Sequence, residues 1–317
     1  MSLFAFIGSI EIGLIYALIA LGVFLSFRVL DFPDLTVDGS YPLGAATAAA
    51  AIVAGFDPFS ATALAILAGA LAGAMTAWLN IRFRILQLLA SILTMTALYS
   101  INLRIMGKPN VPLLNQETLV TWTRDHLTAI FGWAPPSYQL KVWMLGVIVL
   151  IVWGLLSWFL NSEFGLAMRA TGANPRMARA QGVSTQLHNY VGMAISNALV
   201  ALAGALFAQT SGFADITLGT GTIVGGLAAV ILGETLFRTR SIAWLLVACV
   251  VGAILYRLAI ALALNSEWSR TIGLNSSDQN LVTSVLVGLA LILPSQFPRL
   301  RAIFAPASES TRKSASK

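Results

Sequence analysis

The sequence predicts an all-α polytopic membrane protein, and three observations lead to this fold class. Of its 317 residues, 57% are hydrophobic and only 10% are charged, and the mean hydropathy is +0.82. A soluble chain carries roughly a quarter charged residues, because its surface faces water. Stretches without Asp, Glu, Lys or Arg recur at lengths close to the roughly 20 residues that cross a hydrocarbon core as a helix. Lipid must therefore solvate much of this chain.

About nine transmembrane helices are expected (roughly 8–10), one for each charge-free apolar run. The first run should be retained as a helix, because the N-terminus lacks the basic region of a cleavable signal peptide. In chain order, the predicted spans are Ile12–Phe27, Gly39–Phe56, Pro58–Ile81, Ile85–Leu103, Val142–Ser162, Ala180–Ala214, Ile216–Gly233, Ser241–Tyr256 and Gln279–Pro298.

Basic residues predict how the spans are oriented, because cytoplasmic loops carry an excess of Lys and Arg. With the loop 163–188 in the cytoplasm, thirteen basic residues fall inside and five outside, so the N-terminus is expected outside and the C-terminus inside. The inside set is Arg28, Arg82, Arg84, Arg169, Arg176, Arg179, Arg238, Arg240, Arg299, Arg301, Arg312, Lys313 and Lys317. The outside set is Arg104, Lys108, Arg124, Lys141 and Arg270. Arg257 lies in a span near its outer end, where it can snorkel, and is given no role.

The domain organisation is expected to be simple. One transmembrane domain covers residues 1–298, with an external loop at 107–140 that holds a possible amphipathic helix around Glu117–Phe131. The tail 299–317 is rich in Ser and Lys, which predicts a basic, disordered cytoplasmic segment.

Several functional classes find no support in the composition. The single cysteine, Cys249, lies in an apolar run and offers neither a disulfide nor a thiol metal site. His126 and His188 have no partners at metal-ligand spacing, so neither a metal site nor a catalytic residue is expected. The net charge of +6 comes from residues between apolar runs rather than from one basic face, which argues against nucleic-acid binding.

The segment Asp31–Ser40 is wrong for a simple helix in lipid. It holds three carboxylates, a proline and a glycine, and it leads straight into an apolar run. One reading is a cytoplasmic turn whose Asp residues cap the next helix. The other is a broken helix that lines a cavity, where irregular backbone is tolerated. The candidate pathway residues in this segment are Asp34, Thr36, Asp38 and Ser40.

A second irregular segment, Ser211–Thr222, also leads into an apolar run. Asp215-Ile-Thr217 repeats the pattern of Asp34-Leu-Thr36, ahead of a helix expected to run in the opposite direction. An inverted repeat around a pathway at the membrane midplane would give this arrangement, although three residues also match by chance. Asp215 and Thr217 are therefore added to the candidates.

The cytoplasmic loop 163–188 carries a start and a stop for a short helix. Pro175 follows Asn174, which is a good cap, and Gly182 ends the segment Pro175–Gln181. A capped helix that projects from a membrane suits a soluble motor that grips it, but the pattern alone equally allows a helix lying on the surface.

Here the sequence resembles the ABC importer permeases that serve branched-chain amino acids, ribose and related solutes. Arg169–Pro175 and Ala178–Gly182 supply the Arg-Ala-Thr-Gly-x-Asn-Pro and Ala-Arg-x-x-Gly of that family's coupling segment. Leu30–Ala45 resembles its first pore-lining segment, and Thr222–Glu234 its later Ala-Val-x-Leu-Gly motif. The residues that the resemblance assigns to ATPase coupling are Arg169, Thr171, Gly172, Asn174, Pro175, Arg176, Arg179, Gln181 and Gly182.

The resemblance implies a permease domain in the inner membrane of a bacterial cell. Such permeases work as a pair, here expected to be a homodimer, with two cytoplasmic ATPases and an external solute-binding protein. No Gly-x-x-x-x-Gly-Lys-[Ser/Thr] motif occurs in the sequence, so ATP and Mg²⁺ are expected on the partner ATPase and no cofactor on this chain. The chain itself is not expected to be an enzyme.

The solute is read from the segment Asp34–Gly44. Its form, Asp-Leu-Thr-Val-Asp-Gly-Ser followed by Tyr-Pro-Leu-Gly, looks most like a subgroup assigned to tryptophan or tyrosine uptake. It is also similar to the Asp-Leu-Ser-Val-Gly-Ser of the sugar permeases. An amino acid, aromatic or branched-chain, is the expected solute, and a sugar or nucleoside is the alternative.

Polar residues inside the spans complete the candidates. Glu11 is the sharpest outlier, because a carboxylate in lipid costs several kcal/mol. It either lines a cavity and contacts a solute ammonium or is a neutral or hydrogen-bonded packing group. Thr94, Asn102 and Asn197 either bond between helices or line the pore. An ion-coupled secondary transporter is the rival class, but it needs acidic groups within the spans, and only Glu11 clearly qualifies.

Overall fold

The computed structural model describes residues 3–131, 135–237, 239, 241–264, 281, 283–285 and 288. Helices follow the apolar runs because a segment in hydrocarbon must satisfy its backbone hydrogen bonds internally. Within the described residues the elements are α1 (Leu3–Val23), η1 (Phe24–Val29), α2 (Val37–Val53), α3 (Pro58–Phe83), α4 (Gln87–Met106), β1 (Asn110–Pro112), α5 (Leu119–Phe131), α6 (Ser137–Asn161), α7 (Glu163–Ala173), α8 (Pro175–Ala180), α9 (Thr185–Ser211), β2 (Phe213–Asp215), η2 (Ile216–Gly219), α10 (Thr222–Leu236) and α11 (Ile242–Leu264).

The predicted fold class is confirmed. Seven helices of the described residues are long and apolar enough to cross a membrane, and α2, with 17 residues, falls just short in length. The first eight predicted spans each coincide with one of these helices. Most of the ninth, Gln279–Pro298, lies outside the described residues, as do Arg238, Arg240, Arg270 and the tail 299–317.

The boundaries differ where a polar residue lies inside a helix. The first helix begins at Leu3 rather than Ile12, because Glu11 is accommodated within it. Helix α9 begins at Thr185 instead of Ala180, because Gly182 adopts a left-handed φ of 83° that ends the preceding segment. The predicted amphipathic helix in the external loop is present as α5.

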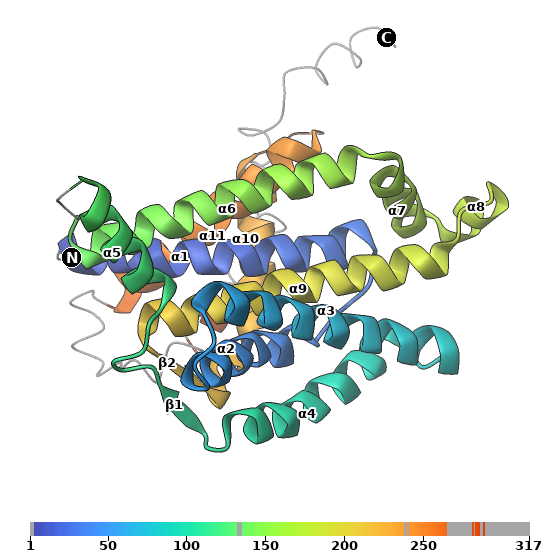
Figure 1. The fold of residues 1–317 in the computed structure, drawn as a ribbon. Helices are drawn as coiled ribbons and strands as arrows, with labels where there is room; N and C mark the ends of the chain where they lie inside the picture. Colours follow the sequence, from blue (N-terminus) through green and yellow to red (C-terminus); the bar gives the residue numbers. More distant parts are fainter. Residues whose placement is uncertain are drawn as a thin grey trace, which may run out of the picture.

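The helices α1 and α9 form the centre of the bundle (Figure 1). Helix α1 lies between α6 and α9, while α2, α3 and α4 pack on the other side of α9. Of the seven candidate spans, α1 is the most enclosed and α6 the least, with 72% and 17% of their apolar windows buried. The sparsely covered face of α6 is therefore the one that lipid must solvate.

Close contact between α2, α3 and α9 depends on small residues. A Cβ added at Gly44 of α2 would overlap the carbonyl of Ala201, and one at Gly73 of α3 would overlap the carbonyl of Met193. Small residues let helix backbones approach closely, which drives packing where lipid offers no hydrophobic gain. The Gly69–Gly73 pair, expected from the sequence to permit close helix contact, does so against α9.

The two irregular segments are real breaks in the helices. After α1 the chain forms a π-helical turn, η1, and reaches Asp31 with a left-handed φ of 53° before α2 begins at Val37. After α9 a left-handed Gly212 leads into β2, and the 3₁₀ turn η2 precedes α10. Strand β2 pairs antiparallel with β1, with Asn110 opposite Asp215.

The bundle has two distinct ends (Figure 1). The short helices α7 and α8 project at one end, beside the start of α9, whereas the N-terminus, α5, β1 and β2 gather at the other. We call these the α8 end and the α5 end. In the predicted orientation the α8 end is cytoplasmic and the α5 end is external.

Candidate functional site

Four of the predicted pathway residues meet in one buried network. The side-chain nitrogen of Asn197 donates to Asp34 Oδ2 at 2.8 Å, and Ser40 Oγ donates to Asn197 Oδ1 at 2.7 Å. The backbone N–H of Thr36 donates to Asp34 Oδ1 at 2.9 Å, and the hydroxyls of Thr36 and Thr76 lie 2.8 Å apart. All five residues are fully buried. This Asp34 network ties the first break to α2, α3 and α9.

The Asp34 network lies within the thickness of the bundle. Thr76 precedes the end of α3 at Phe83 by two helical turns, which places it about 10 Å from that end at 1.5 Å per residue. In such surroundings each polar atom needs a partner, and the network supplies one to both oxygens of Asp34. It holds the irregular segment in place, while a direct role in the pathway stays a prediction.

A cavity of about 160 Å³ lies between α2, α4 and the second break. It brings together three further pathway candidates, Asp38, Asn102 and Thr217, and we call it the Asp38 pocket. The other residues that line it are Gly39, Pro42, Met95, Tyr99, Ile216, Gly219 and Thr220. Sequence reasoning missed Tyr99 and Gly219, because an exposed aromatic and a loop glycine carry no signal by themselves.

The two breaks meet at Asp38. Its carboxylate accepts the backbone N–H of Ile223 at 2.7 Å and so caps α10 from a position 185 residues earlier in the chain. A carboxylate is well placed there, because the first N–H groups of a helix lack partners within the helix. Gly219 permits the contact, since an added Cβ would overlap the carbonyl of Asp38. These contacts join the start of α2, which follows the first break, to the second break and α10.

Asp215 occupies the mouth of the second break. Its Oδ1 accepts the N–H and the hydroxyl of Thr217 at 2.7 and 2.6 Å, and the amide of Asn110 donates to its Oδ2 at 3.1 Å. Burial opposes ionisation of the carboxyl, but these hydrogen bonds outweigh it and lower the pKa of Asp215 below its ordinary value. Asp215 therefore stays ionised and joins β1 to the turn before α10.

Glu11 and Thr94 lie apart from the Asp38 pocket. Glu11 pairs with Lys141 of α6, with 3.7 Å between Oε1 and Nζ. Its carboxylate thus has a protein partner, which the sequence could not indicate because Lys141 had been placed in an external loop. The hydroxyl of Thr94 bonds to the carbonyl of Ala90 one turn earlier in its own helix.

Arg257 is the charged residue whose setting sequence reasoning missed. Its guanidinium lies 3.6 Å from the ring centroid of Tyr16, so it stacks on α1 rather than extending outward. Its Nε is buried and has no acceptor within the described part of the chain. The signal was present, since an arginine within a span points to a functional site by default.

The predicted coupling segment has the expected local structure. Helix α8 begins behind Asn174, whose Oδ1 accepts the N–H of Met177 at 3.0 Å, and ends close to the left-handed Gly182. Of its residues only Ala178 is buried. Met177, which sequence reasoning did not single out, is 62% exposed. Helix α8 thus exposes an apolar side chain and two arginines, Arg176 and Arg179.

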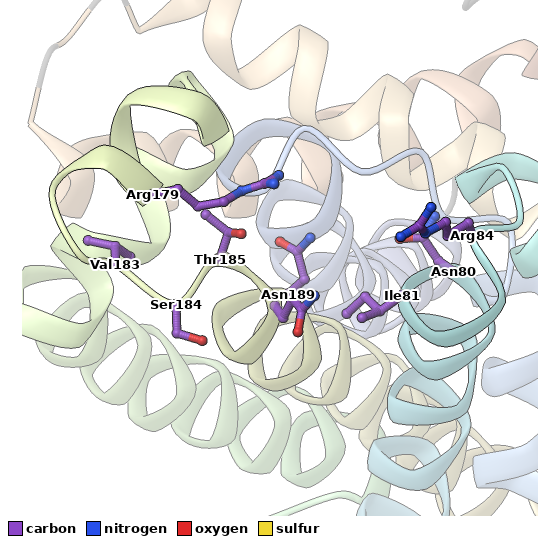
Figure 2. A pocket seen from close by; sticks show the side chains of 9 residues that line it. Asn80, Ile81, Arg84, Arg179, Val183, Ser184, Thr185 and Asn189 are labelled. Carbon is purple, nitrogen blue, oxygen red and sulfur yellow. The ribbon is translucent and has the colours of Figure 1, made fainter.

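A polar pocket of about 580 Å³ lies between α8, the start of α9 and the end of α3. Figure 2 shows Arg179 and Arg84 on opposite walls, with Asn189 between them. Arg84 reaches this position because it ends α3 with a left-handed φ of 56°. The pocket joins the coupling segment to the body of the bundle at its α8 end.

A direct contact links the coupling segment to the first break. An α7 residue, Gly172, lies so close to η1 that an added Cβ would overlap the carbonyl of Val29. Leu30, the next residue, packs against Gly192 of α9. Thr171 is buried with its hydroxyl bonded within α7. A movement of α7 toward η1 would therefore press on the chain at Val29, just before the Asp34 network begins.

Broken helices, an internal pocket with buried polar side chains and a projecting capped helix are features of a membrane transport subunit. Comparison with known proteins identifies the kind of subunit. The family described as "Branched-chain amino acid transport system / permease component" matches residues 6–294. The chain belongs to this permease family, and it is a multi-pass membrane protein.

Individual relatives agree with this assignment. The chain is 37% identical to a tyrosine transport system permease protein of Clostridioides difficile, over 87% of this chain and 86% of the relative. It is 24% identical to the ribose import permease protein RbsC of Escherichia coli, over 83% and 77% of the two chains. The fold also resembles PsaBC from Streptococcus pneumoniae in complex with Fab, with a TM-score of 0.50, 16% identity, and coverage of 92% and 91%.

Proposed function

We propose that this chain is the membrane-spanning subunit of a binding-protein-dependent ABC importer for an amino acid. ATP would be hydrolysed on a separate cytoplasmic ATPase dimer, and a solute-binding protein would deliver the solute at the α5 end. The observation that carries the proposal is α8, a capped helix that projects from the bundle with Arg176, Met177 and Arg179 exposed. A helix buried against its own bundle could not be gripped by a partner.

The mechanism we propose is alternating access driven from α8. When ATP draws the two ATPases together, each displaces the coupling segment, and α7 moves with it. Gly172 then pushes on Val29, so the displacement reaches the Asp34 network and, through Asp38, the start of α10. The solute moves because ATP and the loaded binding protein favour different conformations by differential affinity.

The proposed solute is an amino acid, with tyrosine the first to test. Support comes from the tyrosine transport system permease relative, which is matched at 37% identity, against 24% for the ribose import permease. A sugar or a nucleoside is the alternative. The two classes of solute need different hydrogen-bonding groups in the pathway. Sugar hydroxyls both donate and accept hydrogen bonds, whereas an ammonium group only donates.

We further propose that two copies of this chain form the pathway. In a single subunit the Asp38 pocket lies between α2, α4 and the second break, and pairing two copies would place two such pockets around a common axis. Crosslinking through cysteines placed in the external loop tests the pairing. Crosslinked dimers of this chain alone support a homodimer, and crosslinks formed only with a second permease chain contradict it.

The experiment that tests the function is co-purification with an ATPase. The chain would be expressed together with the products of its neighbouring genes and purified in mild detergent. We expect an ATPase with a phosphate-binding loop to co-purify, and we expect Arg176→Glu with Arg179→Glu to release it or to abolish stimulation by the binding protein.

Gly154→Val is a matched control, because the site is in α6 and has no atom within 4 Å of an added Cβ. It should leave the complex intact. A chain that purifies alone and moves solute down an ion gradient would contradict the importer and favour an ion-coupled secondary transporter.

A further inference from the structure

The Asp38 pocket is small and mostly apolar, with a few polar side chains, among them Asp38 and Asn102. Its volume of about 160 Å³ would hold about five water molecules at roughly 30 Å³ each. It suits the polar head of a small solute better than a whole aromatic side chain. None of the described residues that line it is a lysine or an arginine, and Asp38 contributes a carboxylate. The pocket therefore favours a positively charged group.

Asn102 gives the pocket an unused acceptor. This residue is fully buried, and its side-chain nitrogen donates to the carbonyl of Gly39 at 3.2 Å. That carbonyl can only accept, so it fixes which end of the amide faces it. The remaining atom, Asn102 Oδ1, is buried and has no donor within the described part of the chain. A buried acceptor without a donor costs about 1–3 kcal/mol, which a ligand that donates would recover.

Asp38 has acceptor capacity left after it caps α10. Its carboxylate accepts the backbone N–H groups of Ile223 and Gly221, but a carboxylate offers about four lone-pair positions, and Asp38 is only partly buried. Tyr99 adds a ring that is 57% exposed, and the face of an aromatic ring attracts a cation. The hydroxyls of Thr217 and Thr220 can accept as well.

We propose that the Asp38 pocket receives the ammonium group of the transported amino acid, with Asn102 Oδ1 and the Asp38 carboxylate as its acceptors. The inference rests on the proposed function, because it takes the solute to be an amino acid. The proposal assigns to this pocket the contact with the solute ammonium that the sequence analysis considered for Glu11. The carboxylate of Glu11 is already paired with Lys141 at the α5 end.

The experiment uses the permease–ATPase complex in nanodiscs, with a cysteine at Thr220 as a reporter. Thr220 lines the pocket and is exposed, whereas the native Cys249 is buried and should react slowly. The rate of thiol labelling is measured in the presence of each of two probes. Tyramine has an ammonium group but no carboxylate, and 3-(4-hydroxyphenyl)propionate has a carboxylate but no ammonium group. We expect tyramine to slow labelling and the acid to leave it unchanged.

Asn102→Leu then tests the acceptor itself. A hydrogen bond to a charged group contributes about 1.5–3 kcal/mol. The tyramine concentration that gives half-maximal protection should therefore rise at least about tenfold in this variant. Ser91→Ala is the control, since Ser91 is a buried hydroxyl of the same helix that bonds to Leu88. It should leave protection by tyramine unchanged.

Equal protection by the acid, no protection by either probe, or full protection in Asn102→Leu would overturn the inference. ATP-driven uptake of tyrosine by the same complex reconstituted in proteoliposomes with the binding protein separates this inference from the proposed function. If uptake is present without protection by tyramine, the ammonium site is wrong and the importer stands. If no ATP-driven uptake of any amino acid occurs, the proposed function is wrong.

Discussion

The two Asp-x-Thr segments have the same local geometry in different surroundings. Asp34 and Asp215 each accept the backbone N–H of the threonine two residues later, at 2.9 and 2.7 Å, just before a helix begins. Asp34 is fully buried, and its second oxygen is held by Asn197. Asp215 lies at the mouth of the second break, and its second oxygen is held by Asn110 of a surface strand.

The difference shows that burial, rather than the local turn, sets the role of each aspartate. At Asp34 the turn holds the first break in the interior of the bundle. At Asp215 the same turn holds the second break near the protein surface. Because both segments lead to the contact between Asp38 and α10, we describe Asp34 as an inner anchor and Asp215 as an outer anchor of the two breaks.

The largest effect is expected for Asp34→Ala. It would leave the N–H of Thr36 without an acceptor in the interior, and the side-chain nitrogen of Asn197 would keep only the carbonyl of Met193 as an acceptor. The loss of these bonds to a buried carboxylate should cost about 3 kcal/mol. The measurement is thermal unfolding of the detergent-purified chain. Asp34→Asn keeps one acceptor and should lose less. An Asp34→Ala chain as stable as the parent would mean that the Asp34 network does not hold the first break.

A smaller effect on stability, with a larger one on transport, is expected for Gly172→Val. The added side chain overlaps the carbonyl of Val29 and should cost about 1–3 kcal/mol of overpacking. Because this contact joins α7 to the first break, solute transported per ATP should fall further than stability does. Gly154→Val serves as the control. If both variants transport alike, the proposed mechanical link is wrong.

Asp215→Ala should have a modest effect. It removes the side-chain cap of η2 and the bond to Asn110, a loss of about 1 kcal/mol by analogy with other caps. Its melting temperature should therefore lie between those of the parent chain and Asp34→Ala. A loss as large as that of Asp34→Ala would remove the distinction between an inner and an outer anchor.

The smallest effect concerns pH. The pKa of Asp215 is lowered in the folded chain, so its stabilising contribution is complete above the ordinary aspartate value and is lost as pH falls through the lowered one. The stability difference between the parent chain and Asp215→Ala should thus be constant from about pH 5 to pH 8 and shrink only below about pH 4. A difference that changes near neutral pH would contradict this assignment.

The sequence predicted the features that depend on neighbouring residues. Apolar runs located the helices, and Asn174 with Pro175 located the start of α8, because hydropathy and capping act over a few residues. Arg28 and Glu234 form an ion pair at 2.8 Å that the sequence did not indicate. Each lies one residue beyond the end of a predicted span, Ile12–Phe27 and Ile216–Gly233.

The candidate site was predicted as residues but not as an arrangement. Asp38 caps a helix 185 residues later, and Asn102 reaches the same cavity from α4, so their meeting depends on how α2, α4 and α10 pack. Glu11 and Lys141 were assigned to a span and a loop, because a search for charge-free runs ends each run at a charge. Long-range pairing of this kind has no signature in one sequence.

The central claim is that ATP hydrolysed on a partner drives solute through this chain, and uptake into proteoliposomes tests it most directly. Vesicles would contain the permease and its ATPase, with the binding protein and labelled tyrosine added at the α5 side and ATP at the α8 side. The account predicts uptake that requires ATP, the ATPase and the binding protein together, and that fails in Arg176→Glu with Arg179→Glu. Uptake by the permease alone, driven by an ion gradient, would contradict it.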